Sequence, residues 1–288
     1  MSSSCNSPSG VLLIGLMIAS AWQAAVARVA AEGNSKEPAS STWEGYSRSD
    51  FKVDGRPCIL ISPRTAAKGR PWIWRMEFFG HEPQADLALA SKGFHVAYMD
   101  VQNMYGAPVA LDHLDRFYDE LTTKHHLSRK AVLEGFSRGG LFSLNWAARN
   151  PTNVACIYND APVCDFKSWP GGRGRGKRFD ADWNALLKVY GLTEHNALQY
   201  EGNPVDNLAP LAKAKIPLLH VCGMDDEAVP FEENTGLVAK RYEQLGGEIK
   251  VIEKRGIGHH PHSLKDPTPI VDFILSRTAA DAGSGSPQ

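Results

Sequence analysis

AVLEGFSRGGLFSLNWAARN, at residues 131–150, joins a short apolar run, the pattern G-x-S-x-G and a stretch with the apolar spacing of a helix. It predicts a strand at 131–133, a tight turn and then a helix. A strand–turn–helix unit of this kind is a nucleophile elbow, which holds a serine hydroxyl out at the end of a sheet. Gly135 and Gly139 lack the Cβ atoms that would collide with backbone in so tight a turn. Ser137 is therefore the candidate nucleophile.

Acidic and basic motifs follow the elbow in a definite order. The apolar run IPLLHVCG predicts a buried strand, and MDDEAVP follows it at 224–230. Another short strand precedes GIGHH at 256–260. Ser137, Asp226 and His259 thus occur in the order Ser…Asp…His, with the acid and the base on loops after late strands.

In the order and the residues of these motifs, the chain resembles the α/β-hydrolase superfamily. Within it, the chain is most similar to the serine esterases and peptidases related to the prolyl oligopeptidase catalytic domain. The resemblance covers about residues 51–275 and rests on the elbow, on GMDDEAVP at 223–230 and on GIGH at 256–259. It implies the α/β-hydrolase fold, with a mostly parallel central sheet, helices on both faces and a cap insertion after the sixth strand.

The acid and the base each have a neighbour of the same type. In the family the acid stands three residues before a Val-Pro pair, which selects Asp226 over Asp225. Similarly, the pattern Gly-x-Gly-His selects His259 over His260. Asp160, at the end of an expected strand, is a further alternative because some family members carry the acid on that strand.

The chemistry expected of these residues is acyl transfer. His259 would take the proton of Ser137 and return it to the leaving group, while Asp226 holds the imidazole in one tautomer. One oxyanion donor should be the backbone N–H of Arg138. The other should come from FFGH at 78–81, which stands in the place of the family's His-Gly-X; we expect the N–H of His81, with Gly80 second.

Composition favours a compact enzyme. A chain of 288 residues with 43% hydrophobic and 22% charged content can bury one large core. A formal net charge of −1 excludes the electrostatic footprint of a nucleic-acid-binding protein. Short apolar runs alternate with helical stretches, which predicts a parallel sheet covered on both faces. The runs lie at 58–61, 72–79, 94–99, 131–133, 154–158, 218–221 and 249–252.

The termini are expected to lie outside this domain. The apolar stretch VLLIGLMIA and the later AVA pattern predict a secretory signal peptide at 1–27, and hence a secreted or periplasmic protein. The absence of a lysine or arginine before the apolar stretch leaves an uncleaved anchor as the alternative. Residues 28–43 are expected to form a linker, 44–278 the hydrolase domain, and 279–288 a disordered tail.

Neither a metal nor a disulfide is required by the sequence. The triad accounts for His259 in HHPH at 259–262, and zinc spacing and EF-hand patterns do not occur, so we expect no catalytic metal and no cofactor. Three cysteines fall in apolar strands, and we expect no disulfide essential to the fold. A bridge between Cys156 and Cys164 stays open.

The cap insertion, at about 162–210, carries the features that would select a substrate. Its aromatic residues either bind substrate, with Trp169 the candidate, or form a small core of the cap. The basic loop GGRGRGKR at 171–178 is either solvated or a clamp for an anion. Arg75 and Glu77, on an otherwise apolar strand, either form a buried ion pair or bind substrate.

The function expected from these features is hydrolysis of an ester. The substrate would be a short-acyl or carbohydrate ester of extracellular material, either a small molecule or linked to a polysaccharide. The alternatives are a serine peptidase like the prolyl oligopeptidases, or a binding protein that kept the fold without catalysis. Neither nucleic acid nor membrane, beyond the signal peptide, is expected as a partner.

Overall fold

A computed structural model describes residues 41–278 of the chain. The expected signal peptide, most of the expected linker and the expected tail lie outside these residues. Within residues 41–278, none of the helices combines the length and the apolar character needed to span a bilayer.

Nine strands form one sheet in the order β1-β2-β3-β5-β4-β6-β7-β8-β9. The pairs β1–β2, β2–β3 and β3–β5 at one edge are antiparallel. All the following pairs, from β5–β4 to β8–β9, are parallel. The strand bounds are β1 Ser41–Trp43, β2 Tyr46–Val53, β3 Arg56–Ser62, β4 Trp72–Arg75, β5 His95–Met99, β6 Ala131–Phe136, β7 Val154–Asp160, β8 Leu218–Gly223 and β9 Ile249–Lys254.

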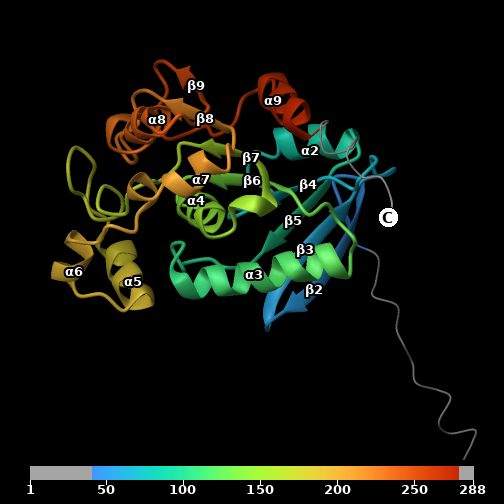
Figure 1. The fold of residues 1–288 in the computed structure, drawn as a ribbon, viewed down its shortest axis with the longest axis horizontal. Helices are drawn as coiled ribbons and strands as arrows, with labels where there is room; N and C mark the ends of the chain where they lie inside the picture. Colours follow the sequence, from blue (N-terminus) through green and yellow to red (C-terminus); the bar gives the residue numbers. More distant parts are fainter. Residues whose placement is uncertain (1–40, 279–288) are drawn as a thin grey trace, which may run out of the picture. The chain divides into compact units, whose positions relative to one another are not determined.

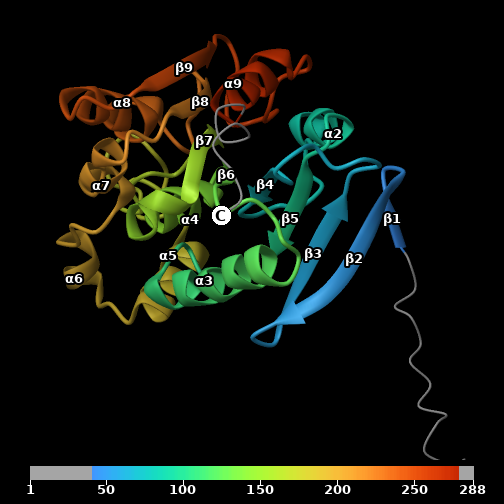
Figure 2. The same ribbon diagram turned by 45° about the vertical axis from the view of Figure 1, so that its right-hand side comes forward.

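Helices cover both faces of this sheet (Figures 1 and 2). Buried residues of α2 and α9 pack on one face, and those of α3, α4, α7 and α8 pack on the other. The α-helices are α2 Gln84–Ser91, α3 Pro108–Thr123, α4 Gly139–Arg149, α5 Asp180–Tyr190, α6 Glu194–Leu198, α7 Ala209–Lys213, α8 Thr235–Gln244 and α9 Thr268–Thr278; short 3₁₀ helices are η1 Pro151–Asn153, η2 Pro204–Asp206 and η3 Phe231–Glu233. The expected α/β-hydrolase fold is confirmed.

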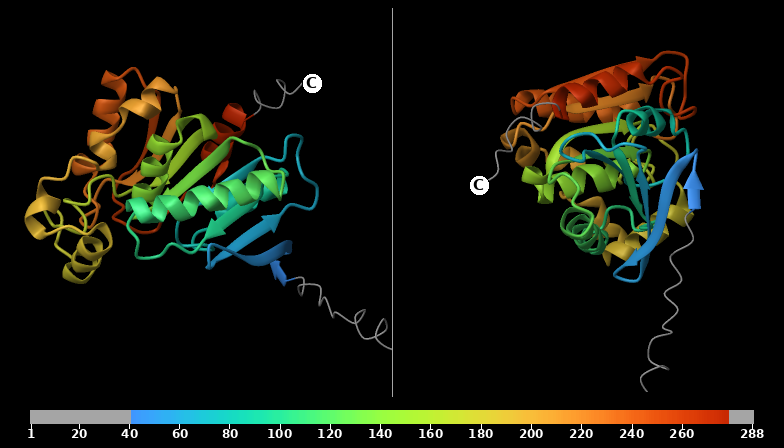
Figure 3. Two further views of the ribbon diagram at one scale, coloured as in Figure 1. Left: turned by 60° about the horizontal axis from the view of Figure 1, so that its bottom comes forward. Right: turned by 90° about the vertical axis from the view of Figure 1, so that its right-hand side faces the viewer.

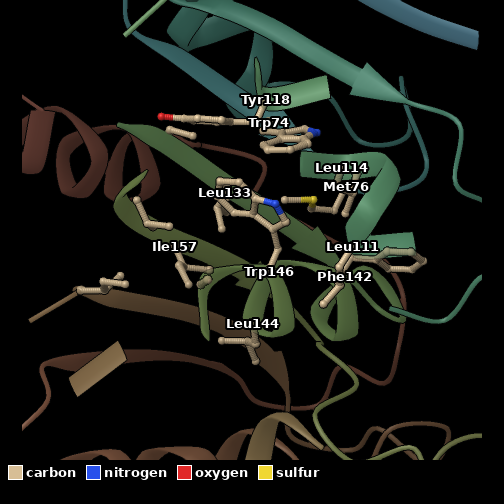
Figure 4. Packing of buried hydrophobic residues seen from close by; sticks show 14 of the residues in the cluster. Trp74, Met76, Leu111, Leu114, Tyr118, Leu133, Phe142, Leu144, Trp146 and Ile157 are labelled. Atoms are coloured by element: carbon tan, nitrogen blue, oxygen red, sulfur yellow. The ribbon is translucent and has the colours of Figure 1, made fainter. Parts of the chain in front are cut away.

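The larger core lies between the sheet and helices α3 and α4. Trp74 on β4 meets the ring of Trp146 on α4 edge to face, with centroids 4.9 Å apart. Leu114 on α3 and Leu133 on β6 are fully buried in the same cluster (Figure 4). Strands β4, β5, β6 and β8 are buried along their whole length, as expected for strands covered on both faces.

Two boundaries differ from the sequence-based expectation. Residues 41–43, expected at the end of the linker, form β1, which pairs with β2. The ring of Trp43 packs on that of Phe79, with centroids 5.2 Å apart. The strand expected at 72–79 ends at Arg75. Beyond it the chain turns, and the N–H of His81 donates to the carbonyl of Phe78.

The cap insertion leaves the sheet after β7 and returns at β8. It thus follows the seventh strand rather than the expected sixth, because β1 forms where a linker was expected. It carries α5 and α6, which project on the opposite side of the molecule from β1 and β2 (Figure 3). Phe166, Trp183 and Leu186 are fully buried in a cluster that the cap shares with Tyr105, Leu141 and Val229 of the hydrolase domain. The cap is therefore a packed substructure that leans on the domain beside the carboxyl ends of the strands.

Candidate active site

The elbow at the end of β6 has the backbone geometry expected of it. Ser137 has a φ of +50°, and its N–H donates to the carbonyl of Asp160 on the neighbouring strand. A Cβ on Gly135 would lie 2.5 Å from Oδ1 of Asn159, and one on Gly140 would lie 2.5 Å from the ring of Pro162. A Cβ on Gly139 would meet only ordinary contacts at 3.8 Å, so the close packing depends on Gly135 and Gly140 and the expectation for Gly139 is wrong.

The imidazole of His259 lies between the serine and a carboxylate. Its Nε2 is 2.9 Å from Oγ of Ser137, and its Nδ1 is 2.7 Å from Oδ2 of Asp226. The Asp226 side chain is 2% exposed, and its Oδ1 accepts hydrogen bonds from the N–H groups of Ala228 and Val229. These backbone donors fix the carboxylate, which in turn fixes the ring of His259.

The competing residues occupy other positions. Asp225 is exposed, and its N–H donates to the carbonyl of Ile257, which ties the two loops together. His260 is exposed beside His259, with ring centroids 5.0 Å apart. Asp160 accepts from the N–H of Ser263 and lies next to a different histidine.

That histidine, His262, forms a second acid–histidine pair that the sequence reasoning missed. Its Nδ1 is 2.9 Å from Oδ1 of Asp160, and both side chains are buried. Lys254 supports the pair because its ammonium donates to the carbonyls of Pro261 and Ser263. The partners in this pair are 102 residues apart, and HHPH was the only sequence signal.

Of the two N–H groups expected to stabilise the oxyanion, one already donates to a carbonyl within the described residues and the other does not. The N–H of Arg138 has no acceptor within residues 41–278, whereas the N–H of His81 is engaged by the carbonyl of Phe78 at 3.0 Å. The expectation for His81 is therefore wrong, because its donor is used in the turn. The N–H groups of Phe78 and Gly80 have no acceptor among the described residues.

Arg75 is a buried structural residue. Its Nη1 lies 2.8 Å from Asp86 and 2.9 Å from Glu134, and the Arg75 side chain is 1% exposed. Its Nη2 donates to the carbonyls of His81 and Phe78. The guanidinium thus holds the turn after β4 in place, and the expected contact with substrate is wrong because the side chain is enclosed.

Glu77 pairs with Arg138, the residue that follows Ser137. Nε of Arg138 lies 2.5 Å from Oε2 of Glu77, whose side chain is fully buried. Arg138 also donates to Oδ1 of Asn103 at 3.0 Å, and its guanidinium lies over the ring of Tyr105 at 5.6 Å. Glu77 is enclosed, so the substrate-binding alternative is wrong for this residue. The ion-pair alternative holds, but with Arg138 as the partner of Glu77 rather than Arg75.

The burial of Glu77 gives a test of this arrangement. Burial raises the pKa of Glu77 to about 7, and the positive charge of Arg138 opposes that rise. A carboxyl whose pKa is raised in the folded state adds stability below its unfolded pKa, and that contribution is lost as pH rises towards 7. From pH 5 to pH 8 the wild type should lose about 2 kcal/mol of unfolding free energy relative to Glu77→Gln, measured by urea denaturation. Parallel pH profiles for the two proteins would contradict the assignment.

The cap residues separate into a core and a rim. Phe166 and Tyr200 stack with centroids 5.0 Å apart, which confirms that most cap aromatics form its core. Trp169 is half-buried, with Tyr105 at 6.4 Å and the exposed ring of Phe179 at 6.0 Å. Trp169 therefore lies at the rim on the side of Tyr105 and Arg138, and substrate contact by Trp169 stays a prediction.

The basic loop of the cap faces acidic residues of the loop after β8. Arg175 lies 3.2 Å from Glu232, and Lys177 lies 3.8 Å from Glu227. These residues border a polar cavity of about 360 Å³ next to Asp226. The four cysteines of the described chain, Cys58, Cys156, Cys164 and Cys222, are buried and free.

Three solved structures to which this chain is similar are each larger than the chain itself. It is similar to a puromycin-hydrolyzing peptidase of Mycobacterium tuberculosis (TM-score 0.62, 14% identity, 83% of this chain and 40% of that chain). It is also similar to Porphyromonas gingivalis dipeptidyl peptidase 4 (TM-score 0.62, 16% identity, 81% of this chain and 36% of that chain). A third similar structure is a Pyrococcus horikoshii acylaminoacyl peptidase (TM-score 0.58, 16% identity, 84% of this chain and 42% of that chain). The chain thus spans about two fifths of the length of these proteins.

The family assignment rests on sequence. No curated protein sequence matches the chain significantly. Residues 90–275, which are well over half of the chain and include the elbow and both later motifs, match the prolyl oligopeptidase family. The chain therefore belongs to the prolyl oligopeptidase family of serine hydrolases.

Proposed function

We propose that the protein hydrolyses an amide bond of a small peptide-like substrate, with Ser137, His259 and Asp226 as its catalytic triad. The observation that carries this proposal is the position of the His259 ring, within hydrogen-bond distance of both Ser137 and Asp226. Membership of the prolyl oligopeptidase family favours peptide-like substrates over the esters expected from sequence. Amide hydrolysis thus takes precedence here over the ester hypothesis.

In the first half of the reaction, Oγ of Ser137 attacks the substrate carbonyl carbon while Nε2 of His259 takes the hydroxyl proton. The carbonyl oxygen becomes an oxyanion, for which we assign as donors the N–H of Arg138 and one of the two N–H groups of the turn without an acceptor among the described residues, that of Phe78 or that of Gly80. The loop bearing Phe78 lies directly against the elbow: the Phe78 ring is 5.2 Å from the Arg138 guanidinium, and a Cβ on Gly139 would be 3.8 Å from that of Glu77.

In the second half, the C–N bond breaks and His259 returns its proton to the departing amine. A water molecule then attacks the acyl–Ser137 ester while His259 takes one of its protons. His259 passes that proton to Oγ of Ser137 as the acyl C–O bond breaks, which releases the acid and restores the serine hydroxyl. Asp226 stabilises the imidazolium that forms in each half. The proton transfers of both halves use the contacts of His259 with Ser137 and Asp226 that this structure already forms.

Polar side chains next to the nucleophile favour small or polar substrates. The Arg138 side chain, 14% exposed, is held beside Ser137 by Glu77 and Asn103. Among the described residues, large hydrophobic side chains are exposed at only three scattered positions: Val109, Phe179 and Leu245. An extensive aliphatic surface of the kind that binds long fatty-acyl chains is therefore not formed by residues 41–278.

A second candidate is hydrolysis of a carbohydrate ester, as the sequence-based hypothesis had it. The partly exposed rings of Trp169 and Phe179 at the rim of the cap favour it, because aromatic faces stack on sugar rings. The apolar N-terminal sequence at 11–19 adds export to this proposal, which would bring the enzyme to extracellular polysaccharide. Both candidates use the same triad.

Matched substrates separate the two candidates. An aminoacyl or dipeptidyl 4-nitroanilide should be cleaved with a kcat/KM in the range of ordinary enzymes, about 10⁴ M⁻¹s⁻¹ or more. The methyl ester of the same acyl group serves as the matched comparison. Turnover of methyl and acetyl-sugar esters without any anilide cleavage would favour the second candidate and reject amide hydrolysis.

A chain-length series tests the size of the acyl site. On p-nitrophenyl esters from acetate to palmitate, kcat/KM should fall beyond about four carbons, because overfilling a short site is unfavourable. A deep apolar tunnel would instead add about 0.8 kcal/mol for each buried methylene, and the rate would rise with chain length. A maximum at eight carbons or longer would contradict a small substrate.

A further inference from the structure

Four histidines gather beside the candidate nucleophile. His81 comes from the turn after β4, and His259, His260 and His262 come from the loop after β9. The rings of His260 and His262 have centroids 4.7 Å apart, and the ring of His81 lies 5.8 Å from that of His262. One ligand nitrogen from each of His81, His260 and His262 lies within 4.8 Å of the other two.

The buried member of this group is held as metal-binding histidines usually are. Nδ1 of His262 lies 2.9 Å from Asp160, whose other oxygen accepts from the N–H of Ser263. This leaves Nε2 of His262 as the nitrogen available to a ligand. A carboxylate on the far nitrogen fixes the ring and its tautomer and raises the basicity of the free nitrogen.

We propose that His81, His260 and His262 form a binding site for a divalent transition-metal ion of the zinc type. Zinc accepts imidazole nitrogens at about 2.0–2.1 Å, so three ligands of a tetrahedral ion lie roughly 3.4 Å apart. His81 and His260 are exposed and can close the remaining distance by side-chain rotation, whereas His262 is fixed. The three nitrogen donors favour zinc, copper or nickel over calcium and magnesium, which prefer oxygen.

The site would make the enzyme sensitive to metal. The ring of His259 lies 4.9 Å from that of His262 and 5.0 Å from that of His260. A dication bound to these two neighbouring rings would disfavour the imidazolium that His259 must become during acyl transfer. We therefore expect inhibition, with hydrolysis at least tenfold slower when the site is filled; this consequence rests on the proposed function, whereas metal binding does not.

Calorimetric titration of the full chain with zinc chloride, after removal of metal by a chelator, tests the site directly. The wild type should bind one zinc ion per chain. The double variant His81→Gln/His260→Gln should bind at least tenfold more weakly, and both changes are at exposed positions that the fold tolerates. His195→Gln, an exposed histidine on α6, is the matched control and should bind as the wild type does. Cobalt(II) should give an intense visible spectrum in the wild type that the double variant lacks.

Equal zinc affinity in the wild type and the double variant would overturn the proposal. So would a wild type without saturable binding, or loss of binding in His259→Ala as large as in the double variant. The activity arm compares each protein with and without zinc, and the double variant should be inhibited at least tenfold less strongly. A protein that binds zinc but does not hydrolyse the substrate would reject only the proposed function. A protein that hydrolyses the substrate but does not bind zinc would reject only the metal site.

Discussion

Replacing Ser137 with alanine is expected to lower kcat by roughly 10⁴-fold or more, while the protein stays folded. Without Oγ no acyl-enzyme forms, and only binding and oxyanion stabilisation remain. Alanine and serine have similar strain at the φ of +50° that the elbow imposes, so the turn should keep its shape. Steady-state kinetics and labelling by a fluorophosphonate probe measure the loss.

Two comparisons make this result specific. Ser91→Ala, which changes an exposed serine on α2, should be labelled and should turn over substrate as the wild type does. A folded Ser137→Ala protein that kept substantial activity and labelling would show that another residue is the nucleophile. A wild type that the probe does not label would instead favour a binding protein on this fold.

The fold was predictable because its strongest signals are local. Strands β4, β5, β6 and β8 are buried on both faces and therefore appear in the sequence as apolar runs. Strand β2, YSRSDFKV, lies near the antiparallel edge and is only partly buried, so its alternation of polar and apolar residues gave no clear run. β1 is shorter still and depends on its pairing with β2.

The site was predictable where spacing along the chain carries the information. The glycine pattern located the elbow, and the short motifs after β8 and β9 placed Asp226 and His259 next to Ser137. Ser137 and His259 are 122 residues apart, but both lie in motifs that carry the family resemblance. The contacts that were missed also join distant segments, and no such motif pairs their partners. Arg75 reaches Glu134 across 59 residues, and Asp160 reaches His262 across 102. Single-sequence patterns hold no record of such pairs.

The cap shows the same division. Its aromatic residues were compatible with either substrate binding or a core, and Phe166 and Trp183 prove to be fully buried in a cluster shared with Tyr105 of the hydrolase domain. The side chain that stands beside the nucleophile is Arg138, and its orientation depends on Glu77 and Asn103 from two other loops. The surroundings of Ser137 therefore depend on long-range packing that composition did not indicate.

The second large effect is expected at His259. Changing it to alanine should cost about as much as Ser137→Ala, because the serine and its base act as one unit. His260→Ala is the matched comparison and should cost less than about tenfold in a metal-free buffer, since the described contacts of that ring do not include Ser137 or Asp226. Steady-state kcat/KM on one substrate ranks the variants by their loss of activity. Denaturation curves for each variant show that the protein is folded.

The adjacent aspartates provide the same contrast for the acid. Asp226→Asn should lower kcat by up to about 10⁴-fold, because an amide neither stabilises the imidazolium nor keeps the required tautomer of His259. Asp225 contributes its backbone N–H to the carbonyl of Ile257, and this bond survives the change to asparagine. Asp225→Asn should therefore stay within a few fold of the wild type. A larger loss at Asp225 than at Asp226 would mean that the carboxylate 2.7 Å from His259 is not the one that acts during turnover.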